Sequence, residues 1–213
     1  MAKFGVLGSG EVGQVLAKGL RDIGHEVRIG SRDPRKLAAY TAETKIPNGT
    51  FAEVAKWGDA LVLAVLGSAA EDVLRQVGVE NFAGKLVIDT TDPITEVPPR
   101  DGVLESFTGP NESLMERLQK AAPHARFVKA FNSVGSGLMV NPKFKGGKPT
   151  MFYCGNDPAA RAETARILEQ FGWEAADMGT AVAARAIEPL AVLWCIRGFR
   201  EDRWTHAFKL LTH

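Results

Sequence analysis

The chain has 213 residues, 45% of them hydrophobic and 24% charged, which is enough for one large domain with a packed core. Its formal net charge of +1 argues against nucleic-acid or membrane-surface binding driven by charge. The longest strongly apolar run, residues 60–66, is too short to cross a bilayer.

A glycine-rich turn organises the first part of the chain. It consists of Gly8, Ser9, Gly10, Glu11, Val12 and Gly13. A short buried strand precedes it at residues 3–7, apolar residues at helical spacing follow to Ile23, and a second strand is predicted at residues 25–29. In this setting Gly8 permits a sharp turn, Gly10 lets a pyrophosphate approach the backbone, and Gly13 lets the helix pack close to the strand. The pattern predicts a dinucleotide site; the alternative is a turn that only joins strand to helix.

The end of the second predicted strand favours NADP over NAD. An NAD site usually carries an acidic residue there to hold the ribose hydroxyls. Here the strand ends in Ser31 and Arg32, with no acid before Asp33, and Lys36 follows. A hydroxyl and a guanidinium fork suit a 2′-phosphate dianion. The alternative is that these cations belong to a solvated helix start capped by Asp33.

The next elements continue the alternation of strands and helices. Residues 60–66 are an apolar run typical of a strand buried on both faces of a parallel sheet, and a helix is predicted from Gly67 to Val77. In such a sheet the end of this strand lies at the switch point where ligands bind. Val65 and Leu66 are therefore candidate walls of the cofactor site, although ordinary strand-end packing explains either residue equally well.

Two later strands, residues 85–89 and 125–131, lead into candidate functional segments. The first precedes a long loop rich in Pro and Gly, residues 97–110. We interpret it as a lid over the cofactor, because long loops in compact domains are usually functional or mobile. The second leads to Asn132, whose amide is placed to bind the cofactor; a simple turn residue is the alternative.

The remaining pattern predicts an α/β fold with a doubly wound, mostly parallel Rossmann sheet over residues 1–178 and a helical C-terminal segment over residues 179–213. Thr180 is the predicted cap of the first helix of that segment. Leu190 to Ile196 are all apolar, and such a helix is expected to be buried. The burial is provided either within the monomer or by a second subunit, and we predict a homodimer.

Several features favour a cytoplasmic protein. The first strand begins almost at the N-terminus, so no signal peptide is expected. Cys154 and Cys195 lack CxxC spacing and are predicted to be buried thiols in a reducing compartment. The four histidines are scattered and form no pattern of metal ligands, so no metal site is predicted.

Short motifs follow one another in a defined order along the chain. They are Gly8-Ser9-Gly10-Glu11-Val12-Gly13, Gly30-Ser31-Arg32, Lys129-Ala130-Phe131-Asn132, Cys154-Gly155-Asn156-Asp157, Asp177-Met178-Gly179 and Ala184-Arg185-Ala186-Ile187-Glu188-Pro189-Leu190. In this order they resemble the coenzyme F420-dependent NADP oxidoreductase family over nearly the whole chain. They are also similar to the reductase domain of the STEAP metalloreductases. The C-terminal segment looks like that of the bacterial branch of the family.

The resemblance implies hydride transfer between NADPH and a flavin-like ring. It implies that Ser9, Gly10, Glu11 and Val12 wrap the pyrophosphate, that Ser31 and Arg32 hold the 2′-phosphate with help from Lys36, and that Ala130 and Asn132 lie near the nicotinamide. The family relies on no dedicated acid or base for the hydride step, so no catalytic residue is named. Many bacteria do not make the deazaflavin, so the expected acceptors are coenzyme F420, FMN or FAD.

Two other functions fit parts of the pattern. A non-catalytic NADP(H)-binding sensor or interaction subunit would bind NADPH without turnover. A β-hydroxyacid dehydrogenase or imine reductase has a similar N-terminal half but needs a large helical substrate domain. We expect only residues 179–213 to follow the Rossmann part, which disfavours this second alternative.

Overall fold

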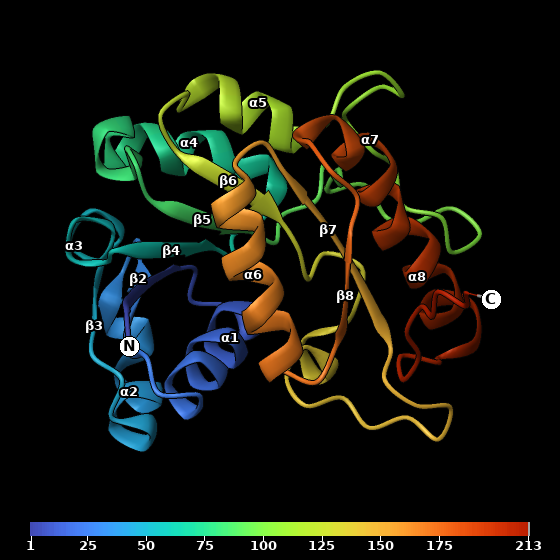
Figure 1. Ribbon diagram of the computed structural model, residues 1–213, viewed down its shortest axis with the longest axis horizontal. Helices are drawn as coiled ribbons and strands as arrows, with labels where there is room; N and C mark the ends of the chain where they lie inside the picture. The colour runs from blue at the N-terminus through green and yellow to red at the C-terminus, as the bar shows by residue number, and fades with distance from the viewer. Residues whose placement is uncertain (213) are drawn as a thin grey trace.

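Eight strands form one mixed sheet in the computed structural model, which describes residues 1–212 (Figure 1). The strands are β1 (Lys3–Leu7), β2 (Glu26–Ser31), β3 (Asn48–Thr50), β4 (Ala60–Leu63), β5 (Leu86–Asp89), β6 (Arg126–Lys129), β7 (Thr150–Gly155) and β8 (Glu174–Asp177). Their order is β3-β2-β1-β4-β5-β6-β7-β8. All neighbouring pairs are parallel except β6 and β7, which confirms the mostly parallel doubly wound fold.

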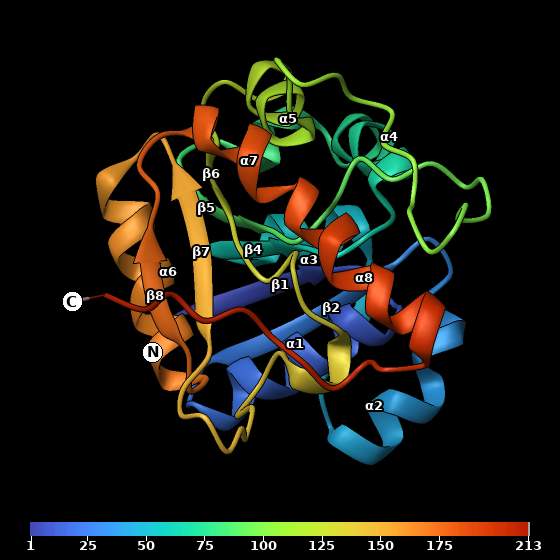
Figure 2. The ribbon, with the colours of Figure 1, turned by 90° about the vertical axis from the view of Figure 1, so that its right-hand side faces the viewer.

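Helices cover both faces of the sheet. The α-helices are α1 (Glu11–Asp22), α2 (Ala38–Thr44), α3 (Phe51–Trp57), α4 (Gly67–Val77), α5 (Leu114–Ala121), α6 (Pro158–Gln170), α7 (Ala184–Ile187) and α8 (Pro189–Glu201). Short 3₁₀ turns lie at Pro34–Leu37, Val79–Phe82, Ser136–Leu138 and Ala181–Ala183. Figure 2 shows α8 running obliquely across one side of the molecule, with α7 continuous with it.

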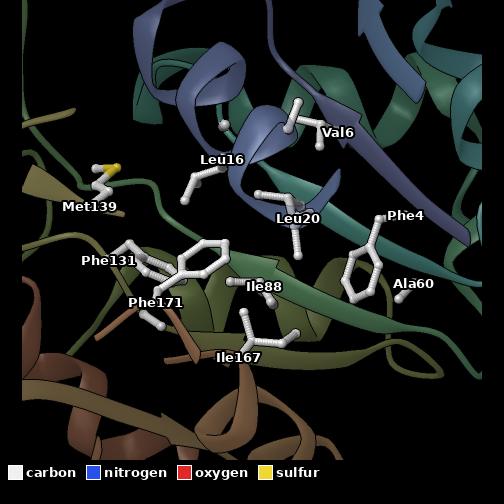
Figure 3. Packing of buried hydrophobic residues seen from close by; sticks show 14 of the residues in the cluster. Phe4, Val6, Leu16, Leu20, Ala60, Ile88, Phe131, Met139, Ile167 and Phe171 are labelled. Carbon is white, nitrogen blue, oxygen red and sulfur yellow. The ribbon is translucent and has the colours of Figure 1, made fainter. Parts of the chain in front are cut away.

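Two hydrophobic clusters lie on opposite faces of the sheet because alternate strand residues point to opposite sides. On one face, Leu16 and Leu20 of α1 pack with Ile88 of β5 and Ile167 of α6 (Figure 3). On the other face, the apolar sides of α3, α4 and α5 cover the remaining strand residues. The parallel strands are buried on both faces, as their continuous apolar runs predict.

Several local predictions need correction. The strand predicted over residues 60–66 ends at Leu63, because the chain leaves the sheet and Leu66 becomes the N-cap of α4. Thr180 does not cap through its side chain. Asn156 instead accepts a hydrogen bond from the backbone N–H of Ala181 at 3.0 Å.

The C-terminal helix is only partly covered within residues 1–212. Ala191, Trp194 and Gly198 of α8 are buried, whereas Leu193 is 54% and Phe199 47% exposed. The apolar run is therefore not fully covered within the single chain, and its burial by a second subunit stays a prediction. No helix in the described part of the chain is both long enough and apolar enough to cross a membrane.

Candidate functional site

A cleft of about 590 Å³ lies where β1, β2 and β4 end, which is the switch point of the sheet. Ten of the residues predicted to bind a cofactor line it. They are Gly8, Ser9, Gly10, Glu11, Val12, Ser31, Arg32, Lys36, Val65 and Leu66. These residues come from three separate stretches of the sequence, 8–12, 31–36 and 65–66, and meet in one groove with the size of a small-molecule site.

The three glycines of the turn differ in the space that a side chain would have at their positions. A Cβ on Gly8 would lie 1.9 Å from the carbonyl oxygen of Ala64, and the φ of Gly8 is +148°. A Cβ on Gly13 would lie 2.1 Å from the carbonyl oxygen of Gly8, so this glycine allows α1 to approach β1 closely. A Cβ on Gly10 would meet nothing within 4 Å, so the space above this residue is open.

The N-terminus of α1 faces this open space. Gly10 is the N-cap and supplies no side-chain hydrogen bond to the first turn. The carboxylate of Glu11 accepts a hydrogen bond from the hydroxyl of Ser136 at 3.1 Å. The N–H groups and the positive end of the helix dipole together make a binding place for an anion.

The end of β2 brings a hydroxyl and two cations to the rim of the cleft. Ser31 is 3% exposed, and its Oγ donates to Oγ of Ser9 at 3.2 Å. Arg35 is held by Asp33 through two hydrogen bonds of 2.8 and 3.0 Å. Arg32 and Lys36 are exposed and form no ion pair within residues 1–212. These two side chains therefore remain available for an anionic ligand.

The opposite wall of the cleft is apolar. Val65 and Leu66 follow the end of β4, and Leu66 is 71% exposed although it is a large hydrophobic residue. An exposed leucine at the mouth of a groove favours contact with a flat apolar ring over solvent. Sequence reasoning missed four further lining residues on α4, namely Ala69, Asp72, Val73 and Gln76.

Three predicted site residues do not line the cleft. Gly13 packs beneath it, and Ala130 is fully buried in the core. Asn132 is 7% exposed, and its Nδ2 donates to Oδ1 of Asp92 and to the carbonyl of Ile187, each at 3.0 Å. The cofactor contacts of Ala130 and Asn132 stay predictions.

A buried ionic cluster lies beside Asn132. Nζ of Lys129 is 2.7 Å from Oδ2 of Asp89 and 3.1 Å from Oε1 of Glu188, and it donates to the carbonyl of Thr91. All three charged side chains are at most 2% exposed. Burial lowers the pKa of Lys129, but the charges of Asp89 and Glu188 outweigh burial and raise it above its ordinary value.

Glu188 links this cluster to two helices. Its carboxylate oxygens accept hydrogen bonds from the backbone N–H groups of Leu114 and Met115, each at 2.9 Å, at the start of α5. Glu188 itself lies between α7 and α8. The carboxylate thus stabilises the N-terminus of α5 and fixes the position at which α8 begins.

One feature of the sequence indicates part of this cluster. Lys129 stands in an otherwise apolar strand, and a lysine in a strand buried on both faces needs an anionic partner. Asp89 occupies the paired position on the neighbouring strand β5. The second partner, Glu188, is far away in the sequence, and no local pattern indicates it.

The two cysteines and the possible metal ligands are the other candidates for a functional role in the described part of the chain. Cys154 is buried as predicted, whereas Cys195 is partly exposed. Burial raises the pKa of the Cys154 thiol to about 12, which is typical of an inert thiol. In the part of the chain that the structure describes, no group of three His, Cys, Asp or Glu side chains could hold a metal ion.

Comparison with known proteins relates this chain to NADP-dependent oxidoreductases. The family model for the coenzyme F420-dependent NADP oxidoreductases matches residues 3–93. The crystal structure of a protein from Arthrobacter sp. FB24, provisionally assigned as an F420-dependent NADP reductase, is 33% identical to this chain. It superposes with a TM-score of 0.93, and the match covers 100% of both chains.

More distant relatives share part of the chain or only the fold. The rat metalloreductase STEAP3 is 26% identical over 194 residues, which cover 90% of this chain and 37% of that protein. The chain therefore spans about a third of the length of this relative. An imine reductase from Aspergillus terreus is 16% identical with a TM-score of 0.66, covering 91% of this chain and 60% of that one, which shows a common fold.

Proposed function

The chain belongs to the coenzyme F420-dependent NADP oxidoreductase family, and from this we propose that it transfers a hydride between NADPH and a deazaflavin or flavin acceptor. One observation carries the proposal. The glycine turn, the open N-terminus of α1 and the exposed cations Arg32 and Lys36 line a single cleft. This arrangement supports binding of the pyrophosphate at the N-terminus of α1 and of the 2′-phosphate beside Arg32 and Lys36.

The proposed acceptor follows from the family and from the apolar side of the cleft that Val65 and Leu66 form. Nicotinamide and flavin-like rings carry the redox chemistry themselves, and the protein aligns them. In this proposal Val65 and the exposed Leu66 pack against the rings and exclude water from the path of the hydride. Coenzyme F420, FMN and FAD are the acceptors to test.

The proposal extends to the compartment, the oligomeric state and the long loop of the protein. We propose a cytoplasmic homodimer in which the exposed side of α8, including Leu193 and Phe199, contacts a second copy. We also propose that residues 97–110 close over the bound cofactor. The molecular mass from sedimentation of the purified protein tests the dimer. The rate at which a protease cuts residues 97–110, measured with and without NADPH, tests the closure.

Replacement of Arg32 by alanine is expected to weaken NADPH binding by about 1.5–3 kcal/mol, the contribution of a hydrogen bond to a charged group. This corresponds to roughly tenfold to a hundredfold in Kd. The affinity for NADH should hardly change because NADH has no 2′-phosphate. Titration of both nucleotides against the wild type and the variant measures the difference.

Arg35→Ala is the matched control, because Arg35 is already held by Asp33 and lies outside the cleft lining. It should leave both affinities within about twofold, a few tenths of a kcal/mol. Equal losses for NADPH and NADH in Arg32→Ala would mean that Arg32 is structural and that the 2′-phosphate lies elsewhere.

The function itself is tested by following NADPH oxidation with the deazaflavin, FMN and FAD in separate reactions. We expect turnover with at least one of them. Tight NADPH binding without turnover would instead support the sensor, and failure to bind NADPH would contradict the assignment of the cleft.

A further inference from the structure

We propose that Ser136 is a positioning residue that holds the carboxylate of Glu11 out of the place where the pyrophosphate of NADPH binds. The inference rests on the proposed function and adds to it a residue that does not line the cleft. It explains how the turn that is proposed to bind an anion accommodates an acidic side chain. Ser136 lies 125 positions from Glu11 in the sequence, so no local pattern indicates the pair.

Glu11 brings a negative charge to the anion-binding end of α1. It is the first residue of the helix, it is exposed, and it lines the cleft. The N-cap Gly10 offers no side chain to the free N–H groups of the first turn. The positive end of the helix dipole attracts a carboxylate as it attracts a phosphate, and Glu11 is the acidic residue of that turn. A free Glu11 carboxylate would therefore compete with a pyrophosphate for the same N–H groups and would repel it.

The structure shows the Glu11 carboxylate turned to a different partner. Its Oε2 accepts a hydrogen bond from Oγ of Ser136 at 3.1 Å. Ser136 is the first residue of the 3₁₀ turn Ser136–Leu138, in the segment that follows β6, and residues 136–138 do not line the cleft. The bond thus draws the charge toward the edge of the cleft. A Cβ on Gly10 meets nothing within 4 Å, so the space above the glycine turn stays open.

Ser136 can position another side chain because its own segment is anchored on two sides. On one side Gly135 packs against the indole of Trp194, a buried residue of α8, and a Cβ on Gly135 would lie 2.7 Å from Cη2 of Trp194. On the other side Val140 packs against Gly19 of α1, where a Cβ would lie 2.7 Å from Cγ2 of Val140. Close packing at both points fixes the position of Ser136 relative to α1.

The bond between Ser136 and Glu11 has two possible roles that an experiment can separate. Glu11 is exposed and Ser136 is partly exposed, so water replaces the bond when it is lost and the stability of the fold changes only modestly. A purely structural role therefore predicts effects that do not depend on the charge of Glu11. The proposed role predicts a loss of nucleotide affinity that disappears when Glu11 carries no charge. A double-mutant cycle distinguishes these two results.

The test begins with the affinities of Ser136→Ala for NADPH and NADH, measured by titration against the wild type. We expect both dissociation constants to rise by roughly fivefold or more, the effect of a carboxylate that occupies a helix N-terminus. The two nucleotides should lose affinity alike because both contain the pyrophosphate. This result distinguishes Ser136→Ala from Arg32→Ala, which is expected to weaken NADPH alone.

Glu11→Gln supplies the readout that a structural role would not move. It removes the charge, so it should bind NADPH at least as tightly as the wild type. Adding Ser136→Ala to Glu11→Gln should then change the Kd by less than about twofold. Ser68→Ala is the matched control, because its hydroxyl also donates to an exposed glutamate, Glu96, at 3.1 Å, but neither residue lines the cleft. It should leave the NADPH affinity unchanged.

Three results overturn the inference. Unchanged nucleotide affinity in Ser136→Ala shows that the bond has no role in binding. An equal loss with Gln at position 11 shows that Ser136 acts through the fold and not through the charge. Weaker NADPH binding by Glu11→Gln alone shows that the carboxylate assists the ligand, and this measurement decides the matter even if Ser136→Ala does not fold.

Failure of this inference is distinguishable from failure of the proposed function, because every readout is a binding affinity. A wild type that binds NADPH but reduces no acceptor overturns the proposed hydride transfer and leaves the role of Ser136 standing. A wild type that does not bind NADPH overturns both.

Discussion

Replacement of Lys129 by methionine is expected to lower the free energy of unfolding by about 3–5 kcal/mol, the effect of breaking a buried ion pair. Methionine fills the space of the lysine stem but leaves the carboxylates of Asp89 and Glu188 buried without their cation. For a chain of this size the melting temperature should fall by roughly 2–4 °C per kcal/mol. Denaturant unfolding and calorimetry measure both quantities.

Lys120→Met is the control for this prediction. Lys120 lies on α5 and is exposed, and its replacement should change stability by less than about 0.5 kcal/mol, as for an ordinary surface substitution. The deficit of Lys129→Met should shrink as the pH is lowered, because protonated carboxyls carry no charge to bury. A Lys129→Met protein as stable as the wild type at neutral pH would show that the cluster contributes little to the fold.

Alanine at Gly8 and alanine at Gly10 are expected to have different consequences. At Gly8 the new Cβ would lie 1.9 Å from a backbone oxygen, so we expect a loss of at least about 1–3 kcal/mol of stability from overpacking, together with loss of NADPH binding. At Gly10 the Cβ meets nothing in the free protein and the φ of −74° suits alanine. The fold should be unaffected, yet the methyl group would occupy the space that a pyrophosphate needs.

Gly10→Ala is therefore expected to weaken NADPH binding by roughly tenfold or more, about 1.4 kcal/mol, with an unchanged melting temperature. Thermal unfolding with and without NADPH separates the two effects in one experiment. Unchanged NADPH affinity in Gly10→Ala would mean that the pyrophosphate does not lie over the turn.

The sequence predicted the sheet, except for its edge strand β3, and the side of the cleft that the glycine turn lines, because their signals are local. The glycine turn sits between a strand and a helix within a single βαβ unit, and the Ser31–Arg32 pair follows the next strand directly. Parallel topology then brings the ends of these strands together without further information. For this reason ten predicted residues line one groove.

The polar contacts beside Asn132 could not be predicted in this way. They join Asp92 to Asn132, 40 positions apart, and Lys129 to Glu188, which is also distant in the sequence. Such pairs depend on how α7 and α8 return to the sheet, and strand and helix patterns do not fix that path. Asn132 illustrates the result: the strand predicted over residues 125–131 ends at Lys129, so Asn132 does not follow it directly, and its amide donates to Asp92 and to the carbonyl of Ile187.

The C-terminal helix shows a different limit. Its composition indicates burial, but composition does not say which surface covers it. In the single chain Trp194 is buried and its Nε1 donates to the carbonyl of His206 at 2.7 Å, while Leu193 remains exposed. The apolar run therefore predicted a helix correctly and its environment only in part.

The most direct test of the account is the fate of deuterium from NADPH labelled at both C4 positions. Hydride transfer to a deazaflavin forms a carbon–deuterium bond that does not exchange with water, so the label reports direct transfer. We predict that the reduced deazaflavin carries one deuterium atom and that the rate shows a primary isotope effect. NADPH oxidation without deuterium in the acceptor, or binding of NADPH without oxidation by any acceptor, would contradict direct hydride transfer by this protein.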